Sequence, residues 1–118
     1  TGPSSLLLAL MASGFNGQNF AFHGYLPINR QELRKKLKEL ENNSYSTGQT
    51  QIFIETPYRN NQLIDAILST CNDGTKLCIA SEITTASERI LTKTTGDWKK
   101  QPPNLHKKPA VFLLYKGA

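Results

Sequence analysis

Two carboxylates follow predicted strands, at positions where an α/β sheet binds its ligands. Glu55 ends the predicted strand 51–55, and Glu82 comes just after the predicted strand 77–81. In open α/β sheets, ligands bind beyond the carboxyl ends of the strands, where loops are free of ladder hydrogen bonds and helix amino termini point inward. We therefore expect both carboxylates at one edge of the sheet, beside a cleft. Local capping and surface ion pairing are the alternative roles for these side chains.

A cation lies close to the first of these carboxylates in the sequence. Arg59 falls in the first turn of the helix predicted after Thr56-Pro57, where threonine has the form of a cap and proline that of a first helical residue. The helix dipole disfavours a cation there by roughly some tenths of a kcal/mol. We expect a compensating partner, either Glu55 or a bound anion. An exposed arginine that tolerates the penalty is the alternative.

Other catalytic signatures are absent from the sequence. His23 and His106 have no cysteine or histidine companions at metal-ligand spacing, so no metal site is predicted. Cys71 and Cys78 lack metal and redox spacing and are interpreted as small apolar residues of a protein in a reducing cytosol. No phosphate-binding glycine loop, nucleophile elbow or zinc signature appears. The residues therefore assign no catalytic base.

Positive charge is concentrated in two segments. The formal net charge is +5, from 14 Lys and Arg against 9 Asp and Glu, and the surplus lies at 30–38 and 99–108. Such clusters favour binding to a phosphate backbone or another polyanion. The alternative interpretation is that they are ordinary solvated lysines at the surface. Arg30, Arg34 and Lys38 follow at i, i+4 and i+8 along one flank of an apolar helical stripe. We expect these three to serve substrate capture rather than folding.

Hydrophobic patterning predicts one α/β domain over residues 1–118, with a mixed sheet of about five strands and helices on both faces. Helices are expected from about residue 3 to a stop at residue 14, and over 29–41, 57–68 and 96–100, and strands over 19–26, 51–55, 77–81, 87–94 and 109–115. The segment 42–48 is polar and ends in glycine, which predicts a flexible connection.

The first predicted helix is apolar nearly all round. This pattern predicts burial on more than one side, by the sheet and by something outside this chain. Its longest apolar stretch, 6–12, is far below the roughly 20 residues that cross a bilayer. No membrane association is expected.

Four segments in register resemble the second domain of the tetrapyrrole methylases. They are Gly2-Pro3-Ser4-Ser5, Phe22-His23-Gly24-Tyr25-Leu26-Pro27, Ile52-Phe53-Ile54-Glu55-Thr56-Pro57-Tyr58-Arg59 and Ile79-Ala80-Ser81-Glu82-Ile83-Thr84. The match spans nearly the whole chain and is closest to the branch that methylates a ribose of small-subunit ribosomal RNA. Tyr25, Tyr58 and Ser81 stand where that branch usually has Phe, His and Arg.

The resemblance implies the carboxyl-terminal domain of a methyltransferase that binds S-adenosylmethionine between two domains. The residues that it implies at the cofactor are Ser4, Ser5, Ile54, Glu55, Ala80, Ile83, Pro109 and Ala110. Arg59 and Glu82 are expected on the substrate side. The expected partners are the amino-terminal domain of the same protein, an RNA or tetrapyrrole substrate and a second copy in a homodimer. The expected location is the cytoplasm, and this chain alone is expected to be inactive.

Two other classes of function stay open at this point. The basic segments would suit a non-catalytic nucleic-acid-binding module, which normally exposes aromatic side chains for base stacking. Most aromatic residues here fall in strand-like apolar segments and are expected in the core. A dimerisation domain would explain the apolar first helix and the apolar last strand as an interface.

Overall fold

The computed structural model describes residues 3–117, apart from the side chains of residues 3 and 4. The elements along the chain are α1 (Pro3–Ser13), β1 (Phe20–Tyr25), α2 (Arg30–Thr47), β2 (Thr50–Ile54), the 3₁₀ turn η1 (Pro57–Arg59), α3 (Asn60–Thr70), β3 (Lys76–Ser81), β4 (Arg89–Thr94), α4 (Thr95–Lys100) and β5 (Ala110–Tyr115).

The strands form one five-stranded mixed sheet in the order β1-β2-β5-β3-β4, which confirms the predicted sheet. β1 and β2 are parallel, whereas β5 is antiparallel to both of its neighbours and β4 is antiparallel to β3. Phe112 of β5 lies opposite Phe53 on one side and Ile79 on the other. β2 and β3 therefore run in the same direction, and both end where β5 begins.

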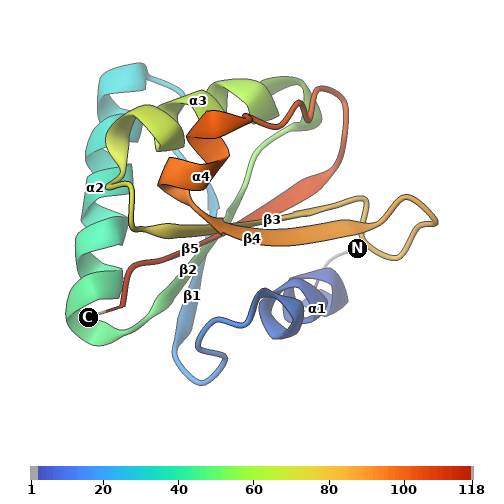
Figure 1. Ribbon diagram of the computed structural model, residues 1–118, viewed down its shortest axis with the longest axis horizontal. Coiled ribbons are helices and arrows are strands. Elements are labelled where there is room, and N and C mark those ends of the chain that lie inside the picture. Colours follow the sequence, from blue (N-terminus) through green and yellow to red (C-terminus); the bar gives the residue numbers. More distant parts are fainter. Residues whose placement is uncertain (1–2, 118) are drawn as a thin grey trace.

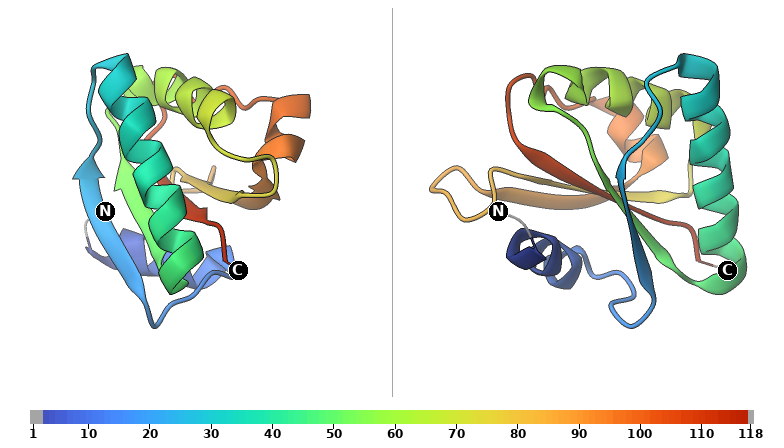
Figure 2. Two further views of the ribbon diagram at one scale, coloured as in Figure 1. Left: turned by 90° about the vertical axis from the view of Figure 1, so that its left-hand side faces the viewer. Right: turned by 180° about the vertical axis from the view of Figure 1, so that it is seen from behind.

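Side chains alternate between two apolar layers, one on each face of the sheet. Phe112 and Leu114 belong to the larger cluster, under α2, α3 and α4, while Val111 and Leu113 belong to the smaller cluster under α1. Figures 1 and 2 show these helices on opposite sides of the sheet, as predicted. Burying a side chain such as that of Phe112 contributes about 1.5–3 kcal/mol. The larger cluster is thus the main core.

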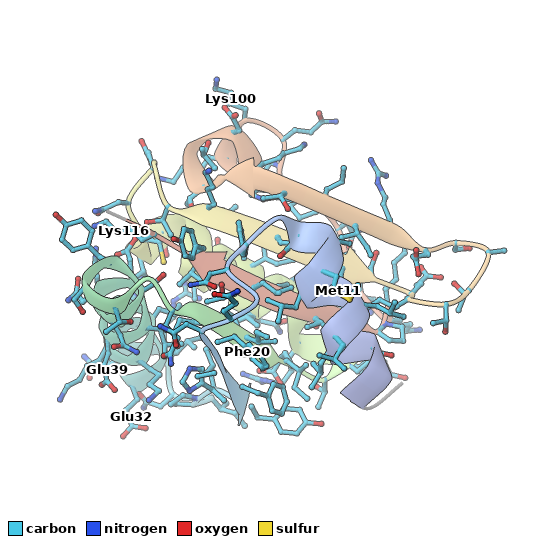
Figure 3. The ribbon with its side chains drawn as sticks, turned by 90° about the horizontal axis from the view of Figure 1, so that it is seen from below. Met11, Phe20, Glu32, Glu39, Lys100 and Lys116 are labelled. Carbon is cyan, nitrogen blue, oxygen red and sulfur yellow. The ribbon has the colours of Figure 1, made fainter. Side chains whose placement is uncertain are left out.

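Only one side of α1 is buried within the described part of the chain. Ala9 and Leu10 pack on the sheet, but Leu7, Leu8 and Met11 are 53%, 43% and 78% exposed. Figure 3 looks onto this face, with α1 crossing in front of the sheet and Met11 labelled on it. Residues 3–117 therefore leave the second side of this helix without the cover that its sequence predicts.

The aromatic residues of β1 are not core residues, contrary to the prediction. Phe20, Phe22 and Tyr25 are 43%, 47% and 63% exposed. β1 is an edge strand, and the main contacts of α1 are with β4 and β5 and those of α2 with β2, β5 and α3. Because neither helix packs mainly on β1, its aromatic rings stay at the surface.

Helix α2 is longer than its sequence predicts. Asn29 caps its start with a side-chain oxygen, as expected. The predicted flexible connection over 42–48 is wrong, because the helix continues until Gly48, which ends it with φ = 72°. The buried Ser44 hydroxyl accepts a hydrogen bond from the Lys116 N–H at 2.9 Å. This tertiary contact supports a last turn that polar composition argues against.

A buried carboxylate joins α2 to the turn that precedes β3. The side chain of Glu41 is 0% exposed and accepts hydrogen bonds from Lys38 Nζ at 2.9 Å, the Asn72 N–H at 2.8 Å and the Thr75 hydroxyl. Burial raises the pKa of Glu41, but the bonds from Thr75, Lys38 and Asn72 together lower it further, so that it lies below its ordinary value. Lys38 therefore takes part in folding, which corrects the expectation that it serves only substrate capture.

Replacing this carboxylate should destabilise the fold in a pH-dependent way. We expect Glu41→Gln to lower the free energy of unfolding at pH 7 by about 1–3 kcal/mol, because buried bonds to a charged acceptor are weakened. The folded pKa is depressed, so this stabilisation is present above the unfolded pKa of 4.5 and is lost as pH falls through the folded pKa. Urea unfolding across this pH range measures it. Glu39→Gln, which removes an exposed carboxylate from the same helix, is the control; an equal loss in both variants would contradict the prediction.

Candidate functional site

A cleft of about 780 Å³ lies at the sheet edge where β2 and β3 end and β5 begins. Its volume is in the range of small-molecule binding sites. The lining residues are Ser5, Leu6, Phe22, Ile54, Glu55, Pro57, Ala80, Glu82, Ile83, Thr84, Thr85, Pro109, Ala110 and Val111. They come from α1, from four of the strands or the loops next to them, and from η1.

The predicted meeting of the two carboxylates is confirmed. Glu55 and Glu82 both line this cleft. The topology brings them together because β2 and β3 are each antiparallel to β5 and therefore end at the same edge. A bound group at this position would meet two carboxylates, one from each strand end.

The wall between the carboxylates is apolar. Ala80 and Val111 belong to the cluster under α1, and Ile54 of β2 and Leu6 of α1 pack against it. The buried Ser5 adds a hydroxyl next to this wall. The combination suits a ligand with a flat apolar part and a positively charged part.

A constrained loop forms the rim of the cleft. Glu82 and Thr84 have φ values of 51° and 71°, which are costly for residues other than glycine, and most of all for β-branched threonine. Hydrogen bonds fix this shape: the Glu82 N–H donates to the Pro109 carbonyl at 2.9 Å, and the Thr84 N–H donates to the Glu88 carboxylate at 2.8 Å. The rim is therefore tied to the start of β5.

Arg59 finds the partner that the sequence left open. Its Nε lies 3.6 Å from a carboxylate oxygen of Glu55, whose side chain is only 9% exposed. The other carboxylate oxygen of Glu55 accepts the Thr56 N–H at 2.8 Å. The hydroxyl of Thr56 makes no capping bond, so its predicted role as a cap is wrong. Each oxygen of the Glu55 carboxylate therefore has a partner, one the Arg59 guanidinium and the other the Thr56 N–H.

The cleft gathers most of the residues that the sequence places at a cofactor or substrate. Those that line it are Ser5, Ile54, Glu55, Ala80, Glu82, Ile83, Pro109 and Ala110. The side chain of Ser4 lies outside the described part of the chain. Arg59 contacts the cleft residue Glu55 but does not itself line the cleft.

Sequence reasoning missed several lining residues. They are Leu6, Phe22, Pro57, Thr84, Thr85 and Val111. Phe22 and Val111 could have been found from strand alternation, since Phe22 stands two residues from Phe20 on one side of β1 and Val111 alternates with Phe112. The threonines depend on the left-handed backbone of the rim, which no local pattern indicates.

The basic edge of α2 is remote from this cleft. None of Arg30, Arg34 and Lys38 lines it, and α2 covers the opposite face of the sheet. Arg30 pairs with Asp65 of α3 at 2.7 Å. Lys38 pairs with Glu41, as described above. Among residues 3–117, Arg34 forms no ion pair with a carboxylate.

The two cysteines are not suited to act as nucleophiles. Burial raises the pKa of the Cys71 thiol to about 12 and also raises that of Cys78, so both thiols stay protonated at neutral pH. Within the described residues, no group of histidine, cysteine, aspartate and glutamate could hold a metal ion. No helix between residues 3 and 117 is long and apolar enough to span a membrane.

Asn60 holds the chain that leads into the cleft. Its fully buried side chain donates through Nδ2 to the carbonyls of Leu105 at 3.1 Å and Lys108 at 2.6 Å. Asn61 accepts the Leu105 N–H at 2.9 Å. The amino end of α3 therefore fixes the segment just before Pro109.

Comparisons with known proteins support the resemblance given above. No protein-family model matches the sequence. The chain is 30% identical over 119 residues to Ribosomal RNA small subunit methyltransferase I of Buchnera aphidicola subsp. Schizaphis graminum, an alignment that covers 98% of this chain and 40% of that relative. The chain thus spans about 40% of the length of this curated relative.

Solved structures share the fold. The methyltransferase CobJ superposes with a TM-score of 0.58 at 15% identity, over 94% of this chain and 47% of that one. A uroporphyrin-III C-methyl transferase from Thermus thermophilus, complexed with S-adenosyl homocysteine, gives 0.50 at 15% identity, over 94% and 49%. The predicted likeness to tetrapyrrole methylases, and to the ribosomal RNA branch in particular, is confirmed.

Removing the Asn60 amide should loosen the segment before β5. We expect Asn60→Ala to lower the free energy of unfolding by about 1–3 kcal/mol, since the carbonyls of Leu105 and Lys108 lose the donor that the buried Asn60 side chain provides. Amide hydrogen exchange over 104–109 should speed up more than exchange in β2. Asn42→Ala, at an exposed position of α2, is the control. Unchanged exchange over 104–109 would show that the loop does not depend on this amide.

Proposed function

We propose that this chain, a homologue of the ribosomal RNA small subunit methyltransferase I proteins, is the carboxyl-terminal domain of a methyltransferase that uses S-adenosylmethionine. The observation that carries the proposal is the cleft at the ends of β2 and β3, which gathers the residues implied at the cofactor. Methylation of small-subunit ribosomal RNA by the longer protein tests it. Absence of methyl transfer to RNA with S-adenosylmethionine bound would overturn the proposed acceptor.

The side chains of the cleft suit this cofactor. The apolar wall of Ile54, Ala80 and Val111 offers a surface to the adenine ring, and the buried Ser5 hydroxyl offers a hydrogen bond. Glu82, which forms no ion pair within the described residues, brings negative charge toward the cationic sulfonium, whereas the charge of Glu55 is partly compensated by Arg59. When bound, S-adenosylmethionine supplies an activated methyl group. The residues of this chain bind it, orient it and exclude water.

Ribosomal RNA is the acceptor that the homology favours. The relatives named for ribosomal RNA match by sequence along almost the whole chain, whereas the tetrapyrrole enzymes match in fold at 15% identity. Transfer to a ribose oxygen would require that the oxygen be placed in line with the methyl group and lose its proton. The constrained rim at 82–88 is well placed to position such an acceptor.

The rest of the longer protein would complete the cofactor site. Phe22 lines the cleft and is 47% exposed, and the exposed side of α1 carries Leu7, Leu8 and Met11. We assign the surface around Phe22 to contact with the amino-terminal domain. A second copy of the protein in a homodimer would cover the apolar side of α1. We propose a cytoplasmic location, which is where a protein that acts on ribosomal RNA would meet its substrate.

The carboxylate of Glu82 should distinguish the charged cofactor from its neutral product. In the longer protein, we expect Glu82→Gln to weaken S-adenosylmethionine binding several-fold and to leave S-adenosylhomocysteine binding nearly unchanged, because only the former carries a sulfonium charge. Calorimetry with both ligands measures the difference. Glu39→Gln, which removes the same charge on α2 outside the cleft, should affect neither ligand. An equal loss for both ligands in Glu82→Gln would remove the electrostatic role.

The isolated chain should bind the cofactor much more weakly than the longer protein does. In the proposed arrangement this chain supplies only one side of the cofactor site, so in its isolated form fewer contacts offset the entropy lost on binding. Calorimetry on the chain alone and on the longer protein compares the two affinities. Submicromolar binding of S-adenosylmethionine by the chain alone would contradict the proposed division between two domains.

A further inference from the structure

A second concave surface lies on the opposite face of the sheet from the cleft. It has a volume of about 700 Å³ and runs between the β3–β4 hairpin and the segment 101–108. We call it the hairpin groove. Ile79 and Leu91, which are paired across the hairpin, contribute its apolar floor together with the buried Trp98. Polar side chains along it are Ser81, Ser87, Gln101 and Asn104.

Three cations line this groove against one carboxylate. Arg89 and Lys93 extend from the same side of β4, and Lys108 extends from the facing segment, while Glu82 is the acidic residue. In the part of the chain that the structure describes, none of these cations pairs with a carboxylate. Lys93 lies over the Trp98 ring, with Nζ 4.6 Å from its centroid. The groove therefore offers uncompensated positive charge.

The walls of the groove are held in place before any ligand arrives. Trp98 donates from Nε1 to the Leu77 carbonyl at 2.8 Å, which fixes α4 on β3. On the other wall, Asn60 bonds the carbonyl of Lys108, and Asn61 bonds the side chain of Asn104 at 2.9 Å. A groove whose walls are already ordered loses little conformational entropy on binding.

The groove and the cofactor cleft meet at one residue. Glu82 lines both of them, because it follows the last residue of β3 at the sheet edge. The two sites open on opposite faces, so a ligand that occupies both must pass around the end of β3. A compact acceptor bound in the cleft would not extend along the hairpin, whereas a polymer would.

We propose that the hairpin groove binds the phosphate backbone of the RNA whose ribose enters the cleft. The inference rests on the proposed function and specifies its substrate as a single strand that crosses the hairpin. Arg89 and Lys108 contact phosphates from the two walls, and Lys93 adds charge from its place on Trp98. Two cations of the α2 edge, Arg30 and Lys38, are already paired with carboxylates of this chain and therefore offer less positive charge to RNA than the groove cations do.

The test removes two groove cations from the longer protein. Arg89→Gln/Lys108→Gln is compared with Lys99→Gln/Lys100→Gln, which loses the same charge from α4 at cations paired with Asp73 and Asp97. Lys100, labelled in Figure 3, projects outward from the end of α4. Lys93 is retained because its contact with Trp98 contributes to packing. Both variants keep the residues that line the cofactor cleft.

Fluorescence anisotropy with a single-stranded fragment of small-subunit ribosomal RNA is measured at several salt concentrations. We expect the groove variant to weaken binding and to reduce the slope of log K against log salt by about 1.4, since each lost phosphate contact on a single strand accounts for roughly 0.7. The control variant should keep the wild-type slope. Equal slopes in the groove variant and the wild type, or an equal reduction in both variants, would overturn the proposal.

Two further measurements separate this inference from the proposed function. If the wild type methylates RNA while the groove variant keeps the wild-type RNA slope, the groove assignment fails and the proposed function stands. If the wild type binds S-adenosylmethionine but no RNA, the groove assignment and the proposed acceptor both fail, while the proposed use of S-adenosylmethionine stands. Uroporphyrin, a compact polycarboxylate, is titrated in parallel. A loss of uroporphyrin affinity without a loss of RNA affinity in the groove variant would overturn the choice of RNA.

Discussion

The antiparallel strand β5 is the constraint on which the remaining structure depends. It forms ladders with β2 on one side and β3 on the other, and it supplies apolar side chains to both faces of the sheet. Because it reverses direction between its neighbours, β2 and β3 are parallel in space without a direct hydrogen-bonded ladder. Their carboxyl ends meet across the start of β5, and the cleft opens there.

Buried polar side chains then fix the helices and loops that this sheet carries. Glu41 connects α2 with the turn before β3, and Asn60 connects α3 with the segment before β5. Each is fully buried and bonds to backbone groups far away in sequence. The cleft and the hairpin groove each depend on further hydrogen bonds. The cleft needs the rim that bonds to Pro109, whereas the groove needs the wall that Asn60 and Asn61 hold.

Local sequence patterns predicted the features that depend on the alternation of apolar residues in strands and on capping and turn residues. They located the strands that precede Glu55 and Glu82 and the cap at Asn29, and they predicted both carboxylates at one edge. They failed where a distant contact decides the outcome: Ser44 supports the last turn of α2, and the position of β1 at the sheet edge leaves its aromatics exposed. The groove was not foreseen, because it needs the pairing of β3 with β4.

The place of β5 also affects the order in which the chain can fold. Gln51 pairs with Leu114, so the central ladder joins residues that are far apart along the chain. Until β5 has been synthesised, β1–β2 and β3–β4 are two separate pairs with open edges and exposed apolar faces. Such nonlocal pairing slows folding, and the unpaired edges favour association with other chains. A nascent chain would therefore keep these edges exposed to association until this strand emerges from the ribosome.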